Sequence, residues 1–275
     1  MKTTLKAFLL FFILIIVSFA ASYIYIDSET DKLVYGYPSW NKEAKSYELL
    51  KERPKNWVSL DKISNDVKWA IILSEDWAFY DHDGLDYNQL EIVLEESLED
   101  GKISRGASTI TQQLVKNALL TQDKTFTRKA KEMLLTLMVE KKMSKDEILE
   151  KYLNMIELGK DLYGVGLAAK YYFNKNSSEL NPKEGAFLAM LLPSPVKYSQ
   201  SFRDKKLTDF ANEQVSSILM KMKQAHKITP EQREFYVMED LSFEKKVKNA
   251  ITPKRDILKK IKTDLGVFDG LEFYE

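Results

Sequence analysis

The feature that most constrains this chain is an uncharged segment near its beginning. Residues 7–26 read AFLLFFILIIVSFAASYIYI and carry no charged side chain. With a helical rise of about 1.5 Å per residue, the segment would span about 30 Å, the thickness of the hydrocarbon layer of a bilayer. Lysines precede it and acidic residues follow it. We therefore expect residues 1–6 to stay in the cytoplasm and the rest of the chain to form an ectodomain.

A cleaved signal peptide is the alternative interpretation of this segment. Residues 18–20 offer a small-residue cleavage site. The apolar run continues past that site to Ile26, which is long for a signal peptide, so we favour a single uncleaved transmembrane anchor over residues 7–26. No other segment of the sequence has a comparable apolar length.

The composition limits the chemistry that the ectodomain can use. The absence of cysteine excludes disulfides, thiolate metal sites and a cysteine nucleophile. The two histidines, His82 and His226, are too few for a histidine-rich metal site, so acid–base catalysis would depend on carboxylates. Lys plus Arg and Asp plus Glu both number 41, and this neutral balance argues against a nucleic-acid partner.

The spacing of apolar residues beyond the anchor predicts a mainly α fold, because few segments alternate with the period of two that is typical of strands. Ser64 and Asp86 each precede an apolar stripe of helical period. Residues 144–147 read SKDE, which is a capping box. Asn181 and Thr229 each stand before a proline that suits the first position of a helix.

The ectodomain divides by composition into three segments. Residues 27–55 are polar, contain glycine and prolines and show no clear period, so we interpret them as a juxtamembrane spacer. Residues 56–200 form the helical core. Residues 201–275 are rich in Lys and Glu and predict a C-terminal helical region of unknown role.

Two stretches of the core combine groups that suit catalysis and binding. Residues 74–84, SEDWAFYDHDG, end an apolar helix with paired acids, aromatic rings, a histidine and a glycine. Burial there would raise the pKa of a carboxylate such as Glu75 toward that of a general base. Residues 105–117, RGASTITQQLVKN, open a helix whose free N–H groups could hold an anion or a sugar hydroxyl. Taken alone, each stretch is equally compatible with an ordinary helix end.

A third stretch is basic. Residues 127–132 read TRKAKE and place Arg128 and Lys129 on the same helix face as Glu132. Between residues 116 and 131 there are five basic side chains and a single acid, an excess that suggests a phosphate or pyrophosphate site. The alternative is an exposed ion pair worth about 0.3–0.5 kcal/mol.

Together these stretches resemble the peptidoglycan glycosyltransferases, which include the polymerase module of class A penicillin-binding proteins and monofunctional transglycosylases. The motif E-D-x-x-F-x-x-H-x-G appears at residues 75–84, G-[GA]-S-T-I-[ST]-Q-Q at 106–113 and R-K-x-x-E at 128–132. Further matches lie at 152–173 and 191–195. The resemblance covers about half of the chain, and the lack of a transpeptidase module after it favours the monofunctional type.

Two places depart from the family pattern. Trp77 and Ala78 stand where many members carry basic residues. Residues 159–162 read GKDL in place of the usual G-x-G-[IV], so Asp161 stands at a loop position where the family has glycine. These departures concern loop geometry and substrate binding rather than the catalytic pair.

The resemblance implies a lysozyme-like helical lobe with a smaller membrane-facing lobe, and an enzyme that polymerises lipid II into glycan strands. The growing lipid-linked chain is the donor and lipid II is the acceptor. The reaction inverts the donor's anomeric carbon and releases undecaprenyl pyrophosphate. By this resemblance Glu75 is the general base, and Glu132 is a second catalytic residue that positions the donor pyrophosphate.

The resemblance also implies the substrate-binding residues. These are Phe79, His82, Gly84, Gly106, Ser108, Thr111, Gln112, Gln113, Lys116, Asn117, Lys124, Arg128, Lys129 and Lys131. No covalently bound cofactor is required, and a divalent cation, Mg²⁺ or Mn²⁺, at the donor pyrophosphate is left open. The expected partners are lipid II, the growing glycan, the bilayer, and transpeptidases or other cell-wall synthesis proteins.

The same resemblance predicts a location in the bacterial cytoplasmic (inner) membrane, with the catalytic domain on its periplasmic or outer face. An exposed apolar patch for membrane insertion is also expected. The candidates are Phe79, Leu85, Phe126 and the aromatic run at residues 171–173, although for that run we favour a place in the core.

Two other functions stay open. A lysozyme-type enzyme that cleaves glycans also uses carboxylates on a helical fold, but it would not need the basic stretch. A non-catalytic scaffold of cell-wall synthesis would be expected to have lost Glu75, Lys129 or Glu132, and all three are present.

Overall fold

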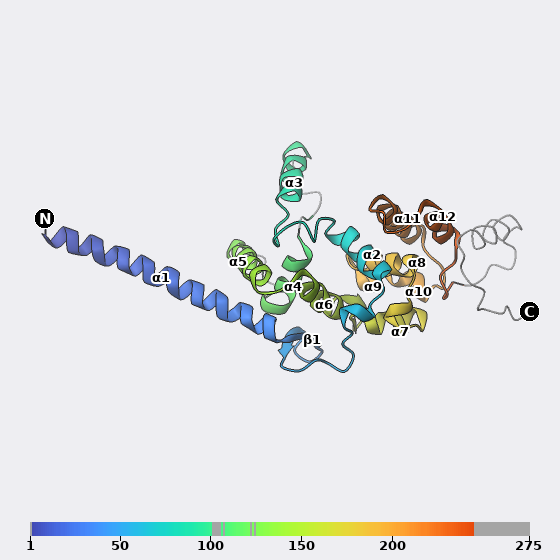
Figure 1. Cartoon of the computed structure of the whole chain (residues 1–275), viewed down its shortest axis with the longest axis horizontal. Coiled ribbons are helices and arrows are strands. Elements are labelled where there is room, and N and C mark those ends of the chain that lie inside the picture. Colours follow the sequence, from blue (N-terminus) through green and yellow to red (C-terminus); the bar gives the residue numbers. More distant parts are fainter. Residues whose placement is uncertain (1, 101–105, 107, 122, 124, 245–275) are drawn as a thin grey trace, which may run out of the picture. The chain divides into compact units, whose positions relative to one another are not determined.

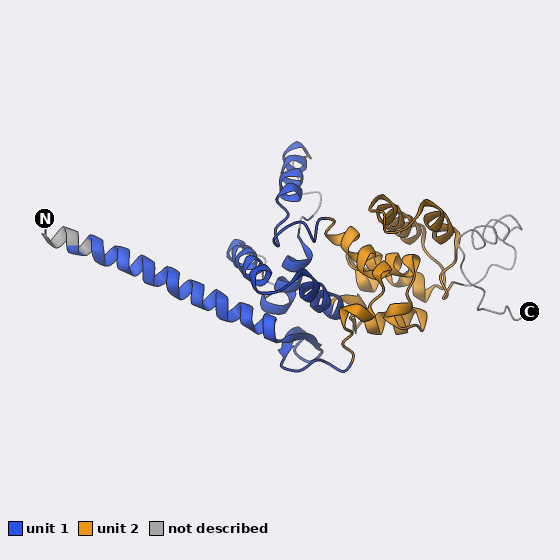
Figure 2. Cartoon of the chain, viewed as in Figure 1, with its two compact units in different colours: residues 1–55, 78–155 blue, residues 56–77, 156–275 orange. Residues whose placement is uncertain are grey.

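The computed structural model describes residues 2–100, 106, 108–121, 123 and 125–244. Within that part of the chain, twelve α-helices and two short 3-10 helices accompany only four short strands, which confirms the predicted mainly α fold (Figure 1). The chain forms two compact units, coloured separately in Figure 2. Unit 1 contains Met1–Lys55 and Ala78–Met155, and unit 2 contains Asn56–Trp77 and Ile156–Glu275. The predicted core of residues 56–200 is therefore shared between the two.

Unit 1 begins with α1, Lys2–Tyr35, a single helix that continues beyond the predicted anchor. Large side chains of its apolar part, from Phe8 to Tyr25, are exposed and pack on no core among the described residues. Thr30 and Leu33, near its end, are fully buried. The helix is long and apolar enough to cross a membrane, and its last turns pack on the rest of unit 1.

The segment predicted as an irregular spacer has regular structure. After the end of α1, β1 (Tyr37–Asn41) and β2 (Ser46–Leu50) form an antiparallel hairpin in which Trp40 pairs with Tyr47. The Tyr47 hydroxyl donates a hydrogen bond of 2.7 Å to the carbonyl of Met155. Each strand has only five residues, most of them half-exposed or exposed, which is too short a pattern to predict a strand from the sequence.

Four helices complete unit 1: α3 (Tyr87–Asp100), α4 (Ile110–Leu119), α5 (Phe126–Lys142) and α6 (Lys145–Met155). α4 packs against both α5 and α6, and the end of α1 packs against α5 and α4. The core between them is aliphatic. Its fully buried side chains include Leu33, Ile110, Leu114, Val115, Leu135, Val139, Ile148, Leu149 and Leu153.

Unit 2 is built around α8 (Pro182–Leu191), in which every residue is buried. α8 packs against α2 (Asn65–Glu75) and α11 (Asp209–Gln224). Gly185 makes the close approach of α2 feasible, because a Cβ there would lie 3.0 Å from the Cα of Val67. The other elements are η1 (Leu60–Lys62), β3 (Glu157–Gly159), β4 (Leu162–Tyr163), α7 (Val165–Phe173), η2 (Ser177–Glu179), α9 (Pro195–Tyr198), α10 (Gln200–Arg203) and α12 (Pro230–Met238).

The predicted helix starts are confirmed where the structure shows a cap. The Ser64 hydroxyl accepts from the backbone of α2, and Asn181 and Thr229 form capping boxes at α8 and α12. The Asp86 carboxylate accepts a hydrogen bond of 2.9 Å from the backbone N–H of Gln89 in α3. The predicted C-terminal helical region is helical through α10, α11 and α12, and residues 245–275 lie outside the described residues.

Candidate functional site

The first motif begins at the end of α2. Glu75 is the last residue of this helix and is half-buried. Ser64 caps the helix at its other end, and its apolar face is buried against α8. Asp76 is buried and its backbone N–H donates a hydrogen bond of 2.7 Å to the carbonyl of Ile72. Glu75 therefore ends a firmly packed helix of unit 2, while the motif from Ala78 onward belongs to unit 1.

The rest of the first motif is a tight turn in unit 1. Gly84 adopts a φ of +89°, and its carbonyl accepts a hydrogen bond of 2.7 Å from the hydroxyl of Thr109. The His82 Nδ1 accepts from the N–H of Gly84 at 3.0 Å. Phe79 is fully buried, with the ammonium of Lys145 4.6 Å from its ring centre. In this structure Phe79, His82 and Gly84 belong to a turn that is hydrogen-bonded to the second motif through Thr109.

A tyrosine in the same turn is held as a hydrogen-bond donor. The Tyr80 hydroxyl donates to the carboxylate of Asp146 at 3.1 Å. Burial, together with the negative charge of Asp146, raises the pKa of Tyr80 to about 12, so its phenol keeps its proton at neutral pH.

The second motif opens α4. Thr109, rather than Ser108, is the N-cap, and it forms a capping box with Gln112. Thr111 has no exposed surface, and its hydroxyl donates to the carboxylate of Glu140. The side chains of Thr111 and Gln112 thus hold the start of the helix in place. Their role in substrate binding stays a prediction.

Other residues of the second motif remain accessible. Gly106 and Ser108 are exposed before the helix. Gln113, Lys116 and Asn117 are half-buried and share one face of α4. The Gln113 side-chain oxygen accepts a hydrogen bond of 3.0 Å from Tyr152, which fixes the orientation of the amide. This face brings an amide, an ammonium and a second amide together over one turn.

The third motif lies in the first turns of α5, where it forms an ion cluster. Glu132 is only 1% exposed. One of its carboxylate oxygens accepts from the Arg128 guanidinium at 2.7 Å, and the other pairs with the Lys129 ammonium. The Nε–H of Arg128 is buried and has no hydrogen-bond partner among the described residues. The cluster carries one net positive charge on a helix whose Lys131 adds another, so it is suited to an anion.

These side chains do not fit a resident metal ion. Glu132 is the one carboxylate of the ion cluster, and both of its oxygens are already paired with cations. Within the described ranges there is no group of three or more His, Asp or Glu side chains that could hold a metal. Lys124, also expected to bind substrate, lies outside the described residues.

α5 brings this cluster close to the end of the apolar part of α1. The Lys131 ammonium donates a hydrogen bond of 2.8 Å to the hydroxyl of Tyr25. Further along α5, Lys142 pairs with Asp27 at 2.5 Å and with Asp31 at 2.7 Å. α1 thus ends its exposed apolar part beside the first turns of α5, at the level of the Arg128–Lys129–Glu132 cluster.

The candidates for an exposed apolar patch differ in their exposure. Phe79 and Leu85 are buried and do not contribute. Tyr172 and Phe173 belong to the core of unit 2, as we favoured from the sequence, but Tyr171 is 58% exposed, so for this residue the core prediction is wrong. Phe126, the first residue of α5, is 89% exposed and remains a candidate.

Sequence reasoning missed Glu140 and Lys145. The Glu140 side chain is nearly buried and accepts from Thr111 and, at 2.8 Å, from Lys145. It follows Glu132 and the buried Thr136 at intervals of four residues along α5. That spacing of polar residues at i, i+4 and i+8 was the available signal, because it puts all three on one helix face.

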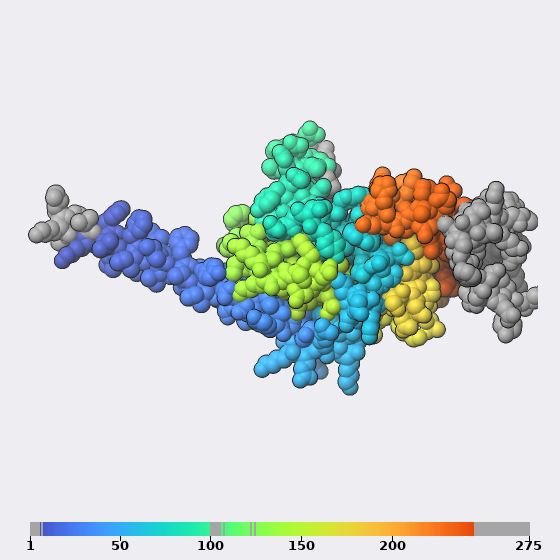
Figure 3. All heavy atoms as spheres, viewed as in Figure 1, coloured from blue at the N-terminus to red at the C-terminus, as the bar shows by residue number. Residues whose placement is uncertain are grey.

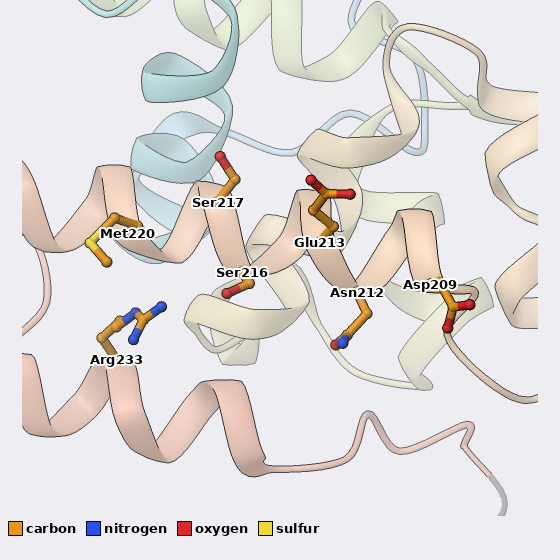
Figure 4. Close-up of a pocket in the computed structure, with 7 residues that line it drawn as sticks. All are labelled: Asp209, Asn212, Glu213, Ser216, Ser217, Met220 and Arg233. Atoms are coloured by element: carbon orange, nitrogen blue, oxygen red, sulfur yellow. The ribbon is translucent and has the colours of Figure 1, made fainter.

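A pocket of about 510 Å³ lies in unit 2 between α11 and α12 (Figure 4). None of the predicted site residues lines it. Its lining residues are Asp209, Asn212, Glu213, Ser216, Ser217, Met220 and Arg233.

The family model described as Transglycosylase matches residues 42–223, which contain all three motifs. The biosynthetic peptidoglycan transglycosylase of Acinetobacter baumannii (strain SDF) is 43% identical over 151 residues, or 55% of this chain and 67% of the relative. The protein of the same name from Aromatoleum aromaticum is 43% identical over 160 residues, or 56% and 70%. That from Chromobacterium violaceum is 44% identical over 144 residues, or 52% and 63%.

Proposed function

The chain belongs to the transglycosylase family, and on that premise we propose that it is a membrane-anchored peptidoglycan glycosyltransferase. The substrate is lipid II, and the product is a lipid-linked glycan strand. The growing strand acts as the donor, and the 4-hydroxyl of the incoming lipid II sugar acts as the acceptor. One displacement inverts the anomeric carbon of the donor and releases undecaprenyl pyrophosphate.

The observation that carries this proposal is the position of the ion cluster relative to α1. The cluster lies on the turns of α5 that pack beside Tyr25, where the exposed apolar part of α1 ends. A helix that spans a bilayer reaches the headgroup layer at this point. The pyrophosphate of a polyprenyl-linked sugar lies in the same layer. Arg128 and Lys129 are therefore placed to hold it without drawing the lipid out of the membrane.

Charge explains why Glu75 and Glu132 have different roles in the reaction. The leaving pyrophosphate already carries negative charge and requires electrostatic stabilisation more than protonation. Arg128, Lys129 and Lys116 supply that stabilisation, and Glu132 fixes the two cations of the ion cluster. The attacking hydroxyl must lose a proton, which Glu75 accepts as general base. The accessible residues of the second motif, Gly106, Ser108, Gln113 and Asn117, contact sugars and phosphates, with Lys124 and Lys131 adding positive charge.

The charges that flank the anchor support one orientation in the membrane. Lysines precede the apolar segment and acidic residues follow it, so the catalytic units face the periplasm or the outer surface. The membrane is the bacterial cytoplasmic (inner) membrane, where lipid-linked sugars are presented to the enzyme. Transpeptidases that cross-link the product are its expected partners.

Incubation of the detergent-solubilised full chain with labelled lipid II, with products separated by size, tests the proposal. The wild type should form long strands that lysozyme digests. Glu75→Gln should slow polymerisation by about 10²- to 10⁴-fold, the usual contribution of a general base. Glu150→Gln is the matched control, because Glu150 forms a surface pair with Arg53 at 3.4 Å and should leave the rate nearly unchanged.

Each other outcome has a distinct meaning. Polymerisation by Glu75→Gln at the wild-type rate would contradict the general-base assignment. Binding of lipid II by the wild type with no polymer would favour a scaffold. Shortening of a preformed glycan would favour a cleaving enzyme.

A further inference from the structure

The helix α3 presents an apolar row that no part of the fold described above uses. Tyr87, Leu90, Leu94 and Leu98 recur at helical spacing along one face. All are exposed, by 66%, 37%, 61% and 76%. Exposed apolar side chains are ordinary when isolated, but a continuous row of this kind marks an interaction surface.

An acidic row runs directly beside the apolar one. Glu91, Glu95 and Glu99 recur at intervals of four residues and are all exposed. The helix contains two further acids and no basic residue. In a chain with equal numbers of acidic and basic side chains, this is a pronounced local charge.

α3 also lacks a packing partner within its own unit. It makes no extensive contact with any other described helix or strand. Figure 2 shows α3 standing apart from α1 and α5, which belong to the same unit, and Figure 3 shows its surface in blue-green, open along most of its length. A short helix with an exposed apolar face gains most of its stability from tertiary packing. Among the described helices and strands of unit 1, none covers this face extensively.

We propose that α3 is a docking surface for a partner protein that presents a basic amphipathic helix. The apolar row of α3 would receive the apolar face of that helix, and lysines or arginines flanking the face would pair with Glu91, Glu95 and Glu99. This is the helix-in-groove mode of recognition, with apolar anchors for affinity and rim charges for partner choice and association rate. The docking surface is separate from the chemistry proposed for the three motifs.

Charge argues against the bilayer surface and against a second copy of this chain as the occupant. The headgroup layer of a bacterial membrane is anionic and attracts basic helices, so it would repel the acidic row. A second copy of this chain would pair α3 with α3 in a symmetric dimer, which brings two acidic rows together. A basic partner is the occupant that both rows of α3 favour.

Peptide binding to the full chain in nanodiscs of zwitterionic phosphatidylcholine tests this proposal. The probe is a labelled 18-residue amphipathic peptide with leucines on one face and lysines beside them. A second peptide carries glutamates in place of the lysines. The wild type should bind the lysine peptide saturably, and should bind the glutamate peptide at least about tenfold more weakly.

Two sets of variants make the test specific to α3. The triple variant Glu91→Lys, Glu95→Lys, Glu99→Lys should exchange the preference, losing the lysine peptide and gaining the glutamate peptide. Leu94→Ser with Leu98→Ser should weaken binding of the lysine peptide about tenfold. The controls are Glu43→Lys, Glu48→Lys, Glu52→Lys, a triple reversal at exposed sites, and Leu167→Ser on α7, where the leucine is 42% exposed. Both controls should leave peptide binding unchanged.

Three results would overturn the proposal. Equal binding of the lysine peptide by the wild type and the Glu-to-Lys triple variant would remove the charge argument. A fluorescent label at Leu94→Cys that anionic vesicles shield from an aqueous quencher would make the bilayer the occupant. Self-association of the full chain that Leu94→Ser with Leu98→Ser abolishes would make a second copy the occupant. Polymerisation of lipid II is measured separately, so none of these results depends on the proposed function.

Discussion

At the scale of single residues, two glycines of the motifs differ sharply in what their surroundings allow. Gly84 has a φ of +89°, and a Cβ there would lie 2.7 Å from side-chain carbons of Glu140 and Thr136. At Gly106, no atom of the described residues lies within 4 Å of the position that a Cβ would occupy. Gly84→Ala should therefore destabilise the protein by about 2 kcal/mol or more, from backbone strain and overpacking. Gly106→Ala should change stability by less than about 0.5 kcal/mol.

Denaturant unfolding of both variants in detergent, with lipid II polymerisation measured in parallel, checks this contrast. Equal stabilities of Gly84→Ala and the wild type would contradict the turn geometry. Loss of activity by Gly106→Ala at unchanged stability would show that a glycine is required here so that the substrate can approach the backbone closely, as the motif implies.

Asp161 replaces a glycine of the family pattern, and the structure explains how the loop accepts it. Its φ is 55°, in the left-handed region that aspartate tolerates better than most residues. Asp161→Gly should therefore leave the free energy of unfolding within about 0.5 kcal/mol of the wild type, because relief of strain offsets the added freedom of the unfolded chain. Asp161→Val should be less stable than Asp161→Gly by about 1–2 kcal/mol, because a β-branched residue is strained at this φ.

Urea unfolding of the two Asp161 variants at one pH gives the comparison directly. Both variants remove the carboxylate that, after burial, helps to raise the pKa of Glu157, so this electrostatic effect cancels between them. A valine variant as stable as the glycine variant would show that the backbone of this loop is not held at positive φ.

The motifs identify residues but not the use of each side chain. Sequence order alone located Glu75, Arg128 and Glu132. It assigned Thr111 and Gln112 to substrate, which stays a prediction, but it did not reveal that their side chains also bond Glu140 and the helix cap. A hydroxyl or amide in a motif serves a ligand or the fold according to what the tertiary structure brings beside it, and that is not local information.

At the scale of elements, α5 links the ion cluster to the end of the apolar part of α1. Lys131 contacts Tyr25, while Lys142, about three turns later on α5, contacts Asp27 and Asp31. α5 thus runs away from the apolar part of α1, and its first residue, Phe126, lies on the membrane side of Lys131. Because Phe126 is 89% exposed, we expect its ring to enter the interfacial layer of the bilayer.

The absence of cysteine permits a direct measurement. Phe126→Cys and Phe210→Cys each give a single site for an environment-sensitive dye, and Phe210 is 44% exposed on α11. In proteoliposomes the dye at residue 126 should shift its emission to the blue and be shielded from iodide, and the dye at residue 210 should show neither effect. Equal quenching at both sites would place the start of α5 in water.

The accuracy of the sequence predictions follows how local each element is. Helix starts at Ser64, Asn181 and Thr229 were predictable because a cap and its partner lie within a few residues of each other. The β1–β2 hairpin was missed because its stability comes from contacts such as that of Tyr47 with the carbonyl of Met155, far along the chain. The division of the first motif between two units is likewise a property of packing.

At the scale of the whole molecule, unfolding is coupled to proton binding through groups in both units, among them the buried Lys151 and the half-buried Asp66. In unit 1, burial lowers the pKa of Lys151 from 10.5 to about 8. In unit 2, burial raises the pKa of Asp66 from 3.8 to about 6. Between pH 8 and 10.5 the unfolded state binds more protons at Lys151, so this group makes stability rise with pH. Asp66 affects stability in a separate, acidic pH range.

The pH range over which Asp66 affects stability can be isolated with one substitution. Between pH 3.8 and about 6 the folded state holds more protons at this carboxyl than the unfolded state, so the wild type loses stability as the pH rises. Asp66→Asn removes this loss. The melting temperatures of variant and wild type should be similar below pH 4 and diverge up to about pH 6, with the variant more stable above it. Asp61→Asn, at an exposed position in η1, should show no such divergence. A difference for Asp66→Asn that is independent of pH, or that opens in the opposite direction, would mean that Asp66 is ionised in the folded protein throughout this range.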